Sequence, residues 1–287
     1  MPGTGQITHV SDTAHWVAIY RAMESERPDA LFHDPYARRL AGPHGEEIVR
    51  TMHKGASWAW PMIVRTAVMD EIILRAVRRD GVQTVVNLAA GLDTRAYRLD
   101  LPPTLRWFDV DFPDVQRYKR DALAGERPRC ALEWAPADLA DPLARRAVLE
   151  RVAAAGGPAL AVTEGLLIYL TPEHVASLAR DLHACPTLAW WLTDLGSPRL
   201  LKMMRRTWGR RVAAGGAPFQ FAPAEGTAFF EPGGWREVEF RSNWEESLRL
   251  HRTMRLAWLW NTLGRLATKR KREEFRRMSG IVLLGRR

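Results

Sequence analysis

Apolar and polar positions follow two periods along this chain, and the change falls near residue 80. Over residues 12–80 the apolar positions recur at helical spacing, as in Trp16, Ile19, Tyr20 and Met23. Beyond them, short apolar runs alternate with segments of helical period. The runs that we expect to form strands cover residues 84–90, 106–111, 130–136, 159–165, 187–194, 235–240 and 280–284. This alternation predicts an α/β fold with a doubly wound, mostly parallel, seven-stranded sheet.

The segments between the first five expected strands have helical character. They cover residues 94–99, 113–124, 142–155 and 172–184, and Thr171 is the expected N-cap of the last one. The two final strands are separated by a long stretch, 243–278, which also has helical period. We therefore expect an N-terminal helical cap, 1–80, and an α/β domain, 81–287, with an insertion at 200–231.

The turn after the first expected strand carries the clearest chemical signal. An apolar run ends at Gly91, and a carboxylate, Asp111, stands at the end of the next strand. A glycine turn lets a ligand approach backbone N–H groups, and an acid about 20 residues later can hold both hydroxyls of a ribose. Ala89 and Ala90 fill the space that a pyrophosphate would need, so a phosphate-free cofactor such as S-adenosylmethionine fits better. Taken alone, the pattern also suits an ordinary strand–turn–helix.

Further motifs around this turn resemble the leucine carboxyl methyltransferase family. They are residues 24–36 (ESERPDALFHDPY), 65–66 (RT), 87–94 (NLAAGLDT), 110–113 (VDFP), 137–139 (ADL) and 163–170 (TEGLLIYL), with a weaker similarity at 229–235 (FFEPGGW). The resemblance covers residues 11–195 and is similar at its N-terminus to the bacterial branch, which includes O-methyltransferases of polyketide biosynthesis. It implies a Rossmann-like class I methyltransferase fold, with the cap contributing to the active site and S-adenosylmethionine as the cofactor.

The resemblance also implies roles for residues at the carboxyl ends of the strands. Asp111 would bind the ribose hydroxyls, Asp138 the adenine amino group, and Leu139 would pack on the adenine ring. Gly91 would pass close to the methionine tail. Ala89 departs from the family, which usually has glycine there, and its methyl group crowds the tail. Asp138 also suits a simple helix N-cap region.

Two charged residues are implied to hold the methionine part of the cofactor. Glu164 would lie near the ammonium group, although a strand-end acid satisfied by a neighbouring helix is an alternative. Arg65 would pair with the carboxylate. It stands in an apolar helical stretch, where an unpaired guanidinium would be costly, so a carboxylate partner is expected. Asp70 and Glu71 are the alternative partners.

The implied reaction is methyl transfer to a small-molecule acid, with a polyketide-like aromatic acid as the expected substrate. A carboxylate is already ionised at neutral pH and needs no general base, whereas the alternative acceptor, a hydroxyl or a phenol, calls for one. His33 is the best candidate for such a base, although a histidine before Asp-Pro also suits a turn. The residues expected to contact the substrate are Trp58, Trp60, Arg205, Arg206, Phe219 and Phe221, which also suit a core and a solvated surface.

Charge and cysteine content bear on other classes of protein. The formal net charge of +9 leaves open a non-catalytic relative that binds nucleic acid, but no nucleic-acid-binding motif accompanies the basic runs 202–211 and 269–277, and a solvated helix face is preferred for the latter. Cys130 and Cys185 are isolated, so we expect neither a disulfide nor a metal site. No apolar run approaches the ~20 residues that cross a bilayer, and the N-terminus has no signal-like apolar region. A cytoplasmic enzyme without a membrane or nucleic-acid partner is therefore expected.

Overall fold

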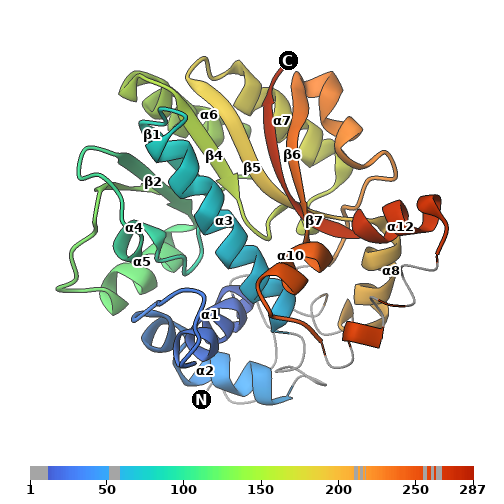
Figure 1. Cartoon of the computed structure of the whole chain (residues 1–287). Helices are drawn as coiled ribbons and strands as arrows, with labels where there is room; N and C mark the ends of the chain where they lie inside the picture. The colour runs from blue at the N-terminus through green and yellow to red at the C-terminus, as the bar shows by residue number, and fades with distance from the viewer. Residues whose placement is uncertain are drawn as a thin grey trace.

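The computed structural model describes residues 12–51, 59–209, 213, 216, 218–254, 257–259, 262 and 267–287. Within them, seven strands form one sheet in the order β3-β2-β1-β4-β5-β7-β6 (Figure 1). The strands are β1 (Thr84–Leu88), β2 (Arg106–Asp111), β3 (Ala131–Pro136), β4 (Ala159–Thr163), β5 (Leu188–Gly196), β6 (Trp235–Ser242) and β7 (Ser279–Arg286). Neighbours from β3 to β5 are parallel, whereas β7 runs antiparallel between β5 and β6. The expected sheet is confirmed.

Helices cover both faces of the sheet. They are α1 (Asp12–Ser25), α2 (Ala37–Thr51), α3 (Trp60–Arg78), α4 (Arg95–Arg98), α5 (Pro113–Ala122), α6 (Pro142–Ala155), η2 (Leu167–Tyr169), α7 (Pro172–Ala184), α8 (Pro198–Thr207), η3 (Gly226–Gly233), α10 (Asn243–Arg249) and α12 (Lys269–Arg276). Helices α5 to α8 begin with a proline, which has no N–H to lose at that position. The Thr171 hydroxyl accepts a hydrogen bond from the His174 N–H, so the N-cap expected for α7 is confirmed.

The two faces of the sheet pack into separate cores. Side chains alternate along β1, so Val85 joins a cluster with α1, α2 and α3, whereas Val86 joins a cluster with α6 and α7. All five residues of β1 are buried, as in a parallel strand that is covered on both sides. In Figure 1, α3 crosses the front of the sheet and α6 and α7 lie behind it.

Three elements end earlier than their sequence patterns predict, because of the local backbone conformation. β1 stops at Leu88 because Ala89 adopts a positive φ of 54°, and β4 stops two residues before Gly165, whose φ is 65°. The stretch 243–278 is not one long helix, because α10 ends and His251 takes a positive φ of 52° before α12 begins. These breaks place loops at the carboxyl edge of the sheet.

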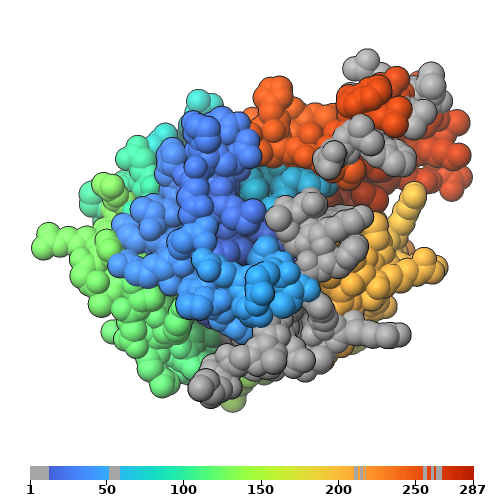
Figure 2. Space-filling model, turned by 90° about the horizontal axis from the view of Figure 1, so that it is seen from below, coloured from blue at the N-terminus to red at the C-terminus, as the bar shows by residue number. Residues whose placement is uncertain are grey.

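The N-terminal helices α1 and α2 lie below this edge in Figure 1. Figure 2 shows the molecule from below: α1 and α2 (blue) occupy one part of this face, and α8 (yellow-orange) and the C-terminal residues (orange to red) lie at the other.

Helix α12 is solvated. It has no buried residue, and Arg270 and Arg276 pair with Glu274 and Glu273 of the same helix. The solvated helix face expected for this basic run is confirmed.

Both cysteines belong to the hydrophobic cores. Cys130 and Cys185 are buried and unbridged. Among the described residues, no group of three or more His, Cys, Asp or Glu side chains is placed to hold a metal ion. Nor does any helix in the described ranges combine the length and the apolar character that crossing a membrane requires.

Candidate functional site

A cavity of about 600 Å³ runs along the carboxyl edge of the sheet. Its wall includes residues from the ends of β1, β2, β4 and β5, from α1, α3 and α8, and from the junction of β6 with β7. This volume is within the range of small-molecule sites. The edge is also where ligands bind in open α/β sheets, because the strand order reverses there. The cavity therefore lies where the sequence motifs meet.

The turn after β1 lines one end of the cavity. Gly91 has a positive φ of 50°, and its backbone N–H donates to Asp111 Oδ2 at 2.6 Å. The Phe112 N–H donates to the other oxygen, Oδ1, at 2.7 Å. Burial raises the pKa of Asp111 although these two backbone bonds favour the ionised form. The carboxylate is thus fixed in orientation, and each oxygen keeps a lone pair for a ligand.

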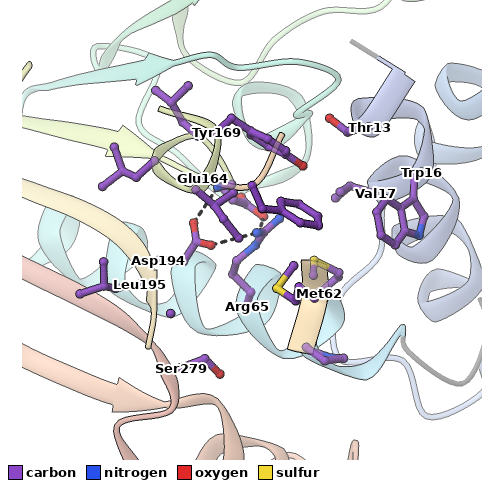
Figure 3. A pocket seen from close by; sticks show the side chains of 18 of the residues that line it. Thr13, Trp16, Val17, Met62, Arg65, Glu164, Tyr169, Asp194, Leu195 and Ser279 are labelled. Atoms are coloured by element: carbon purple, nitrogen blue, oxygen red, sulfur yellow. Dashed lines mark hydrogen bonds and ion pairs between the residues drawn. The ribbon is translucent and has the colours of Figure 1, made fainter. Parts of the chain in front are cut away.

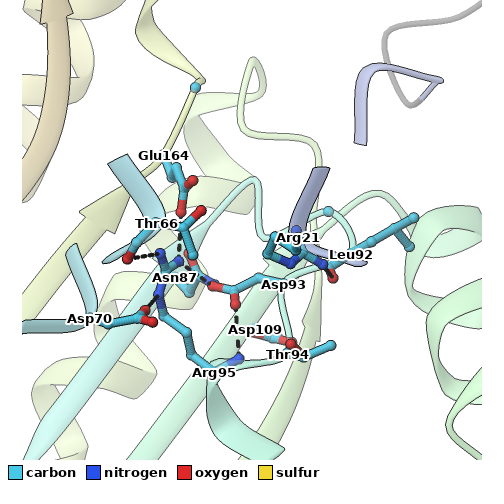
Figure 4. Close-up of polar contacts among 12 residues, drawn as sticks. Arg21, Thr66, Asp70, Asn87, Leu92, Asp93, Thr94, Arg95, Asp109 and Glu164 are labelled. Atoms are coloured by element: carbon cyan, nitrogen blue, oxygen red, sulfur yellow. Dashed lines mark hydrogen bonds and ion pairs between the residues drawn. The ribbon is translucent and has the colours of Figure 1, made fainter. Parts of the chain in front are cut away.

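Arg95 is the centre of a buried ion-pair network beneath this turn (Figure 4). Its guanidinium donates to Asp70 at 2.6 Å, to Asp93 at 2.8 Å and to Glu164 at 2.6 Å, and its side chain is only 2% exposed. Asp93 also accepts a bond from the Asn87 amide at 2.9 Å. The positive charges around it hold the pKa of Asp93 far below its usual range despite burial. The network joins α3, the β1 turn and the end of β4.

Arg65 lies in the cavity wall between two carboxylates (Figure 3). Its Nε donates to Glu164 at 2.9 Å and its Nη1 to Asp194 at 3.1 Å. Asp194 also accepts the Gly165 N–H at 2.6 Å. Burial alone would raise the pKa of Glu164, but Arg95 and Arg65 hold it below its usual value. Burial would lower the pKa of Arg65, but Asp194 and Glu164 raise it.

The alternative partners considered for Arg65 are engaged elsewhere. Asp70 pairs with Arg95 and Arg98, and Glu71 pairs with Arg241 and Arg249. Both alternatives are therefore wrong, and the partners are acids at the ends of β4 and β5, which follow α3 by about a hundred residues.

The structure brings together many of the residues that the sequence singled out. Those that line the cavity are Arg65, Ala89, Gly91, Asp111, Glu164, Trp60, Phe219 and Phe221. Asp138 is exposed and accepts a bond from the Ala140 N–H, and Leu139 is half-buried; neither belongs to the cavity wall as described. Their contact with adenine stays a prediction.

Other predicted site residues are not among the described residues of the cavity wall. His33 is exposed and is not part of the wall, so we do not propose it as a base. Arg205 and Arg206 are exposed as well, and Arg205 Nε donates to the Phe219 carbonyl at 2.7 Å. Arg205 thus supports the backbone of Phe219, which lines the cavity. Trp58 falls outside the described residues.

The sequence reasoning missed several residues of the wall. Asp194 and Asp93 follow or end apolar runs, which is the same signal that identified Asp111. Tyr169 stacks on Phe219 with ring centres 5.7 Å apart. Trp244 meets the ring of Trp60 edge-on at 6.5 Å. All four rings line the cavity, so these parts of its wall are mainly apolar.

The strand order and the antiparallel β7 define the class I methyltransferase fold. The chain is similar in structure to a DUF574 family protein from Streptomyces avermitilis, with a TM-score of 0.63 and 13% identity over 94% of this chain and 97% of that one. A Thermobifida fusca protein named as a methyltransferase gives a TM-score of 0.54 and 15% identity, with 94% of each chain covered. At these identities the likeness shows the fold, as expected from the sequence.

The chain belongs to the leucine carboxyl methyltransferase family, whose profile matches residues 14–183. A relative from Frankia alni is 36% identical over 189 residues, which cover 60% of this chain and 63% of the relative. One from Saccharopolyspora erythraea is 38% identical over 191 residues, covering 62% and 64%. Both are named S-adenosyl-L-methionine-dependent methyltransferases. This chain spans a little under two thirds of the length of these relatives, and the family resemblance is confirmed.

Proposed function

We propose that this chain transfers the methyl group of S-adenosyl-L-methionine to a carboxylate oxygen of a small, largely apolar molecule. Family membership makes S-adenosyl-L-methionine the cofactor. The acceptor rests on one observation: the described residues of the cavity wall include no histidine, lysine or cysteine. An acceptor that is already ionised needs no such base.

The cofactor fits the β2–β1–β4 end of the cavity. The oriented carboxylate of Asp111 suits a ribose diol, since each of its oxygens has one lone pair left. Gly91 offers close backbone approach, and Glu164 supplies negative charge for an ammonium group. Arg65 borders the same space; its Nε and Nη1 donate to Glu164 and Asp194, which leaves Nη2 for the cofactor carboxylate. Bound there, S-adenosyl-L-methionine supplies an electrophilic sulfonium methyl group.

Two acids and a phenol of the wall are poorly suited to take a proton from an acceptor. Glu164 and Asp194 are held by Arg65, and burial raises the pKa of the Tyr169 phenol, which therefore stays neutral. Arg199 lines the cavity and forms no ion pair within the described ranges, so its positive charge is available to an anionic acceptor. A carboxyl group with a pKa of ~4 is ionised at neutral pH.

The chain's contribution to catalysis is then alignment and exclusion of water. Holding two reactants in line can supply roughly 7–11 kcal/mol of the barrier. The apolar wall formed by Trp60, Trp244 and Phe221 adds to this, because methyl transfer from a cation to an anion gives two neutral products. Loss of charge is favoured where the dielectric constant is low.

The proposal is tested by incubating the protein with methyl-labelled S-adenosyl-L-methionine and a panel of aromatic and polycyclic acids. Each acid is compared with the phenol of the same carbon skeleton. We expect label in products that mild alkali releases as methanol, because methyl esters hydrolyse under those conditions. Label that appears only in alkali-stable products would refute the carboxylate acceptor and favour a hydroxyl acceptor. Asp111→Ala serves as the control that removes a cofactor contact without touching the acceptor end.

A further inference from the structure

Helix α8 lies in a basic segment of the chain to which the proposed function gives no role beyond Arg199. Between Asp194 and Glu225 the sequence contains six lysines and arginines and no acid. Four of the six belong to α8, are exposed and form no ion pair within the described ranges: Arg199, Lys202, Arg205 and Arg206. By contrast, α12 pairs two of its arginines with its own glutamates. The charge of α8 is therefore left open to solvent.

Three of these cations lie on one face of α8, beside the cavity. Arg199, Lys202 and Arg206 stand at positions i, i+3 and i+7, and Met203 lies between them at i+4. Arg199 and Met203 line the cavity, and Met203 is 37% exposed, so this face runs from the cavity wall into solvent. In Figure 2, extended side chains of α8 (yellow-orange) project from the edge of the molecule. We call Arg199, Lys202 and Arg206 the cationic strip.

The cationic strip is unfavourable for the stability of the helix itself. Like charges three or four positions apart repel each other on a helix surface, and Lys202 has such a neighbour on each side, Arg199 and Arg206. Arg199 also lies in the first turn, where the helix dipole disfavours positive charge. No acid in the described part of the chain offsets these effects. We therefore expect the strip to act on molecules that approach the cavity.

The spacing of the strip allows its three charges to act together. At 1.5 Å per residue, Arg206 lies about 10 Å along the helix axis from Arg199. The Debye length is about 8 Å at physiological ionic strength, so the fields of neighbouring cations overlap. A site flanked by charge of one sign raises the association rate of an oppositely charged ligand roughly 10- to 1,000-fold. Leu200 and Met204, which also line the cavity, offer an apolar wall to the body of such a ligand.

We infer that the cationic strip captures anionic acceptors at the surface and guides them to Arg199 in the cavity wall. This inference rests on the proposed function, because it takes the acceptor to be an anion. Lys202 and Arg206 do not line the cavity, yet they become specificity-determining residues that act on the association rate. A neutral molecule of the same shape gains nothing from the strip, so anionic molecules are selected before they enter the cavity.

Stopped-flow fluorescence with two dyes of one skeleton tests the strip without methyl transfer. Anilinonaphthalene sulfonate is an aromatic anion, phenylnaphthylamine is the same molecule without the sulfonate, and both become brighter in an apolar cavity. In Lys202→Glu/Arg206→Glu we expect the association rate of the sulfonate to fall about tenfold in about 10 mM salt. In about 1 M salt the rate should match that of the wild type, because the Debye length is then about 3 Å. The association rate of the neutral dye should be the same in both proteins.

Arg146→Glu/Arg180→Glu is the matched control. The two arginines occupy exposed positions of α6 and α7, behind the sheet, form no ion pair within the described ranges and do not line the cavity. This variant has the same net charge as Lys202→Glu/Arg206→Glu and should bind the sulfonate at nearly the wild-type rate. If the strip variant fails to fold, as judged by its melting temperature, Lys202→Gln/Arg206→Gln replaces it. Its charge changes by half as much, so the rate should fall about threefold.

The inference is overturned if the wild type binds neither dye, if the control slows the sulfonate as much as the strip variant does, or if charge reversal leaves both rates unchanged. The last result is the one expected of a strip that docks a macromolecular polyanion instead. Salt-dependent capture that requires Lys202 and Arg206, without ester formation from any acid, supports the strip and refutes the proposed carboxylate chemistry. Ester formation without charge-dependent capture does the reverse.

Discussion

Removal of the Arg65 side chain should destabilise the protein through one identifiable carboxylate. Arg65 is 8% exposed and lies between Glu164, which is 15% exposed, and Asp194, which is 24% exposed. In Arg65→Ala, Glu164 keeps its ion pair with Arg95. Asp194 keeps only the Gly165 N–H, because the described residues offer it no second cation.

The size of the effect follows from this difference. Breaking a buried pair by removing one partner costs about 3 to 5 kcal/mol. Since only one of the two acids loses its cation, and that acid is partly exposed, we expect a value near the lower limit, about 3 kcal/mol. For a domain of this size that corresponds to a fall in melting temperature on the order of 6–12 °C.

A double-mutant cycle with Asp194→Asn provides the assay. In Arg65→Ala/Asp194→Asn no uncompensated charge is left, so the double variant should be more stable than Arg65→Ala alone, with a coupling energy of about 2 kcal/mol. Denaturant unfolding of the wild type, the two single variants and the double variant measures this coupling energy. As a control, Arg180→Ala, at an exposed helix position, should change the free energy of unfolding by less than about 0.5 kcal/mol. Strictly additive effects would refute the reasoning.

Three further predictions concern the cofactor end of the cavity. Asp111→Ala should weaken S-adenosylhomocysteine binding more than tenfold, because each hydrogen bond to a charged group contributes about 1.5–3 kcal/mol; an unchanged dissociation constant in the folded variant would remove Asp111 from the site. Ala89→Gly should relieve about 1–2 kcal/mol of positive-φ strain and raise both stability and cofactor affinity, whereas Ala90→Gly, where φ is not positive, should only destabilise; melting temperatures that fall equally would contradict this. The folded-state pKa of Glu164 lies below the usual 4.5, so its stabilising effect is complete above pH 4.5 and is lost as the pH falls through the lower value. The difference in melting temperature between wild type and Glu164→Gln should therefore shrink below pH 4.5, and a constant difference would argue against the ion pairs.

The parts of the fold and site that local pattern determines could be predicted from the sequence. Apolar runs with small-residue turns located the strands, and the acids at their ends, Asp111 and Glu164, could be placed at one edge because parallel strands share it. Arg65 could be expected to have a buried acidic partner because its helix is otherwise apolar. In each case the relevant signal lies within a few residues of the position concerned.

What could not be predicted depends on contacts between distant segments. Asp194 holds Arg65 across 129 positions, and nothing near either residue encodes the pairing. Nothing in the sequence distinguishes Arg95 from the other arginines, whereas in the structure three acids pair with it. The exclusion of Arg205 from the cavity follows from its bond to the Phe219 carbonyl, which is a property of the folded loop.

The arrangement of the cavity along the sheet edge has an evolutionary consequence. At the cofactor end, Arg65 and Arg95 share acids from several elements, so a single substitution there disturbs several ion pairs at once. At the other end the wall consists largely of aromatic and methionine side chains, which can repack one at a time. If the proposed function holds, new acceptors can be accommodated by successive tolerated changes near β6 and β7 while the methyl donor stays the same, and one scaffold can diversify its products in this way.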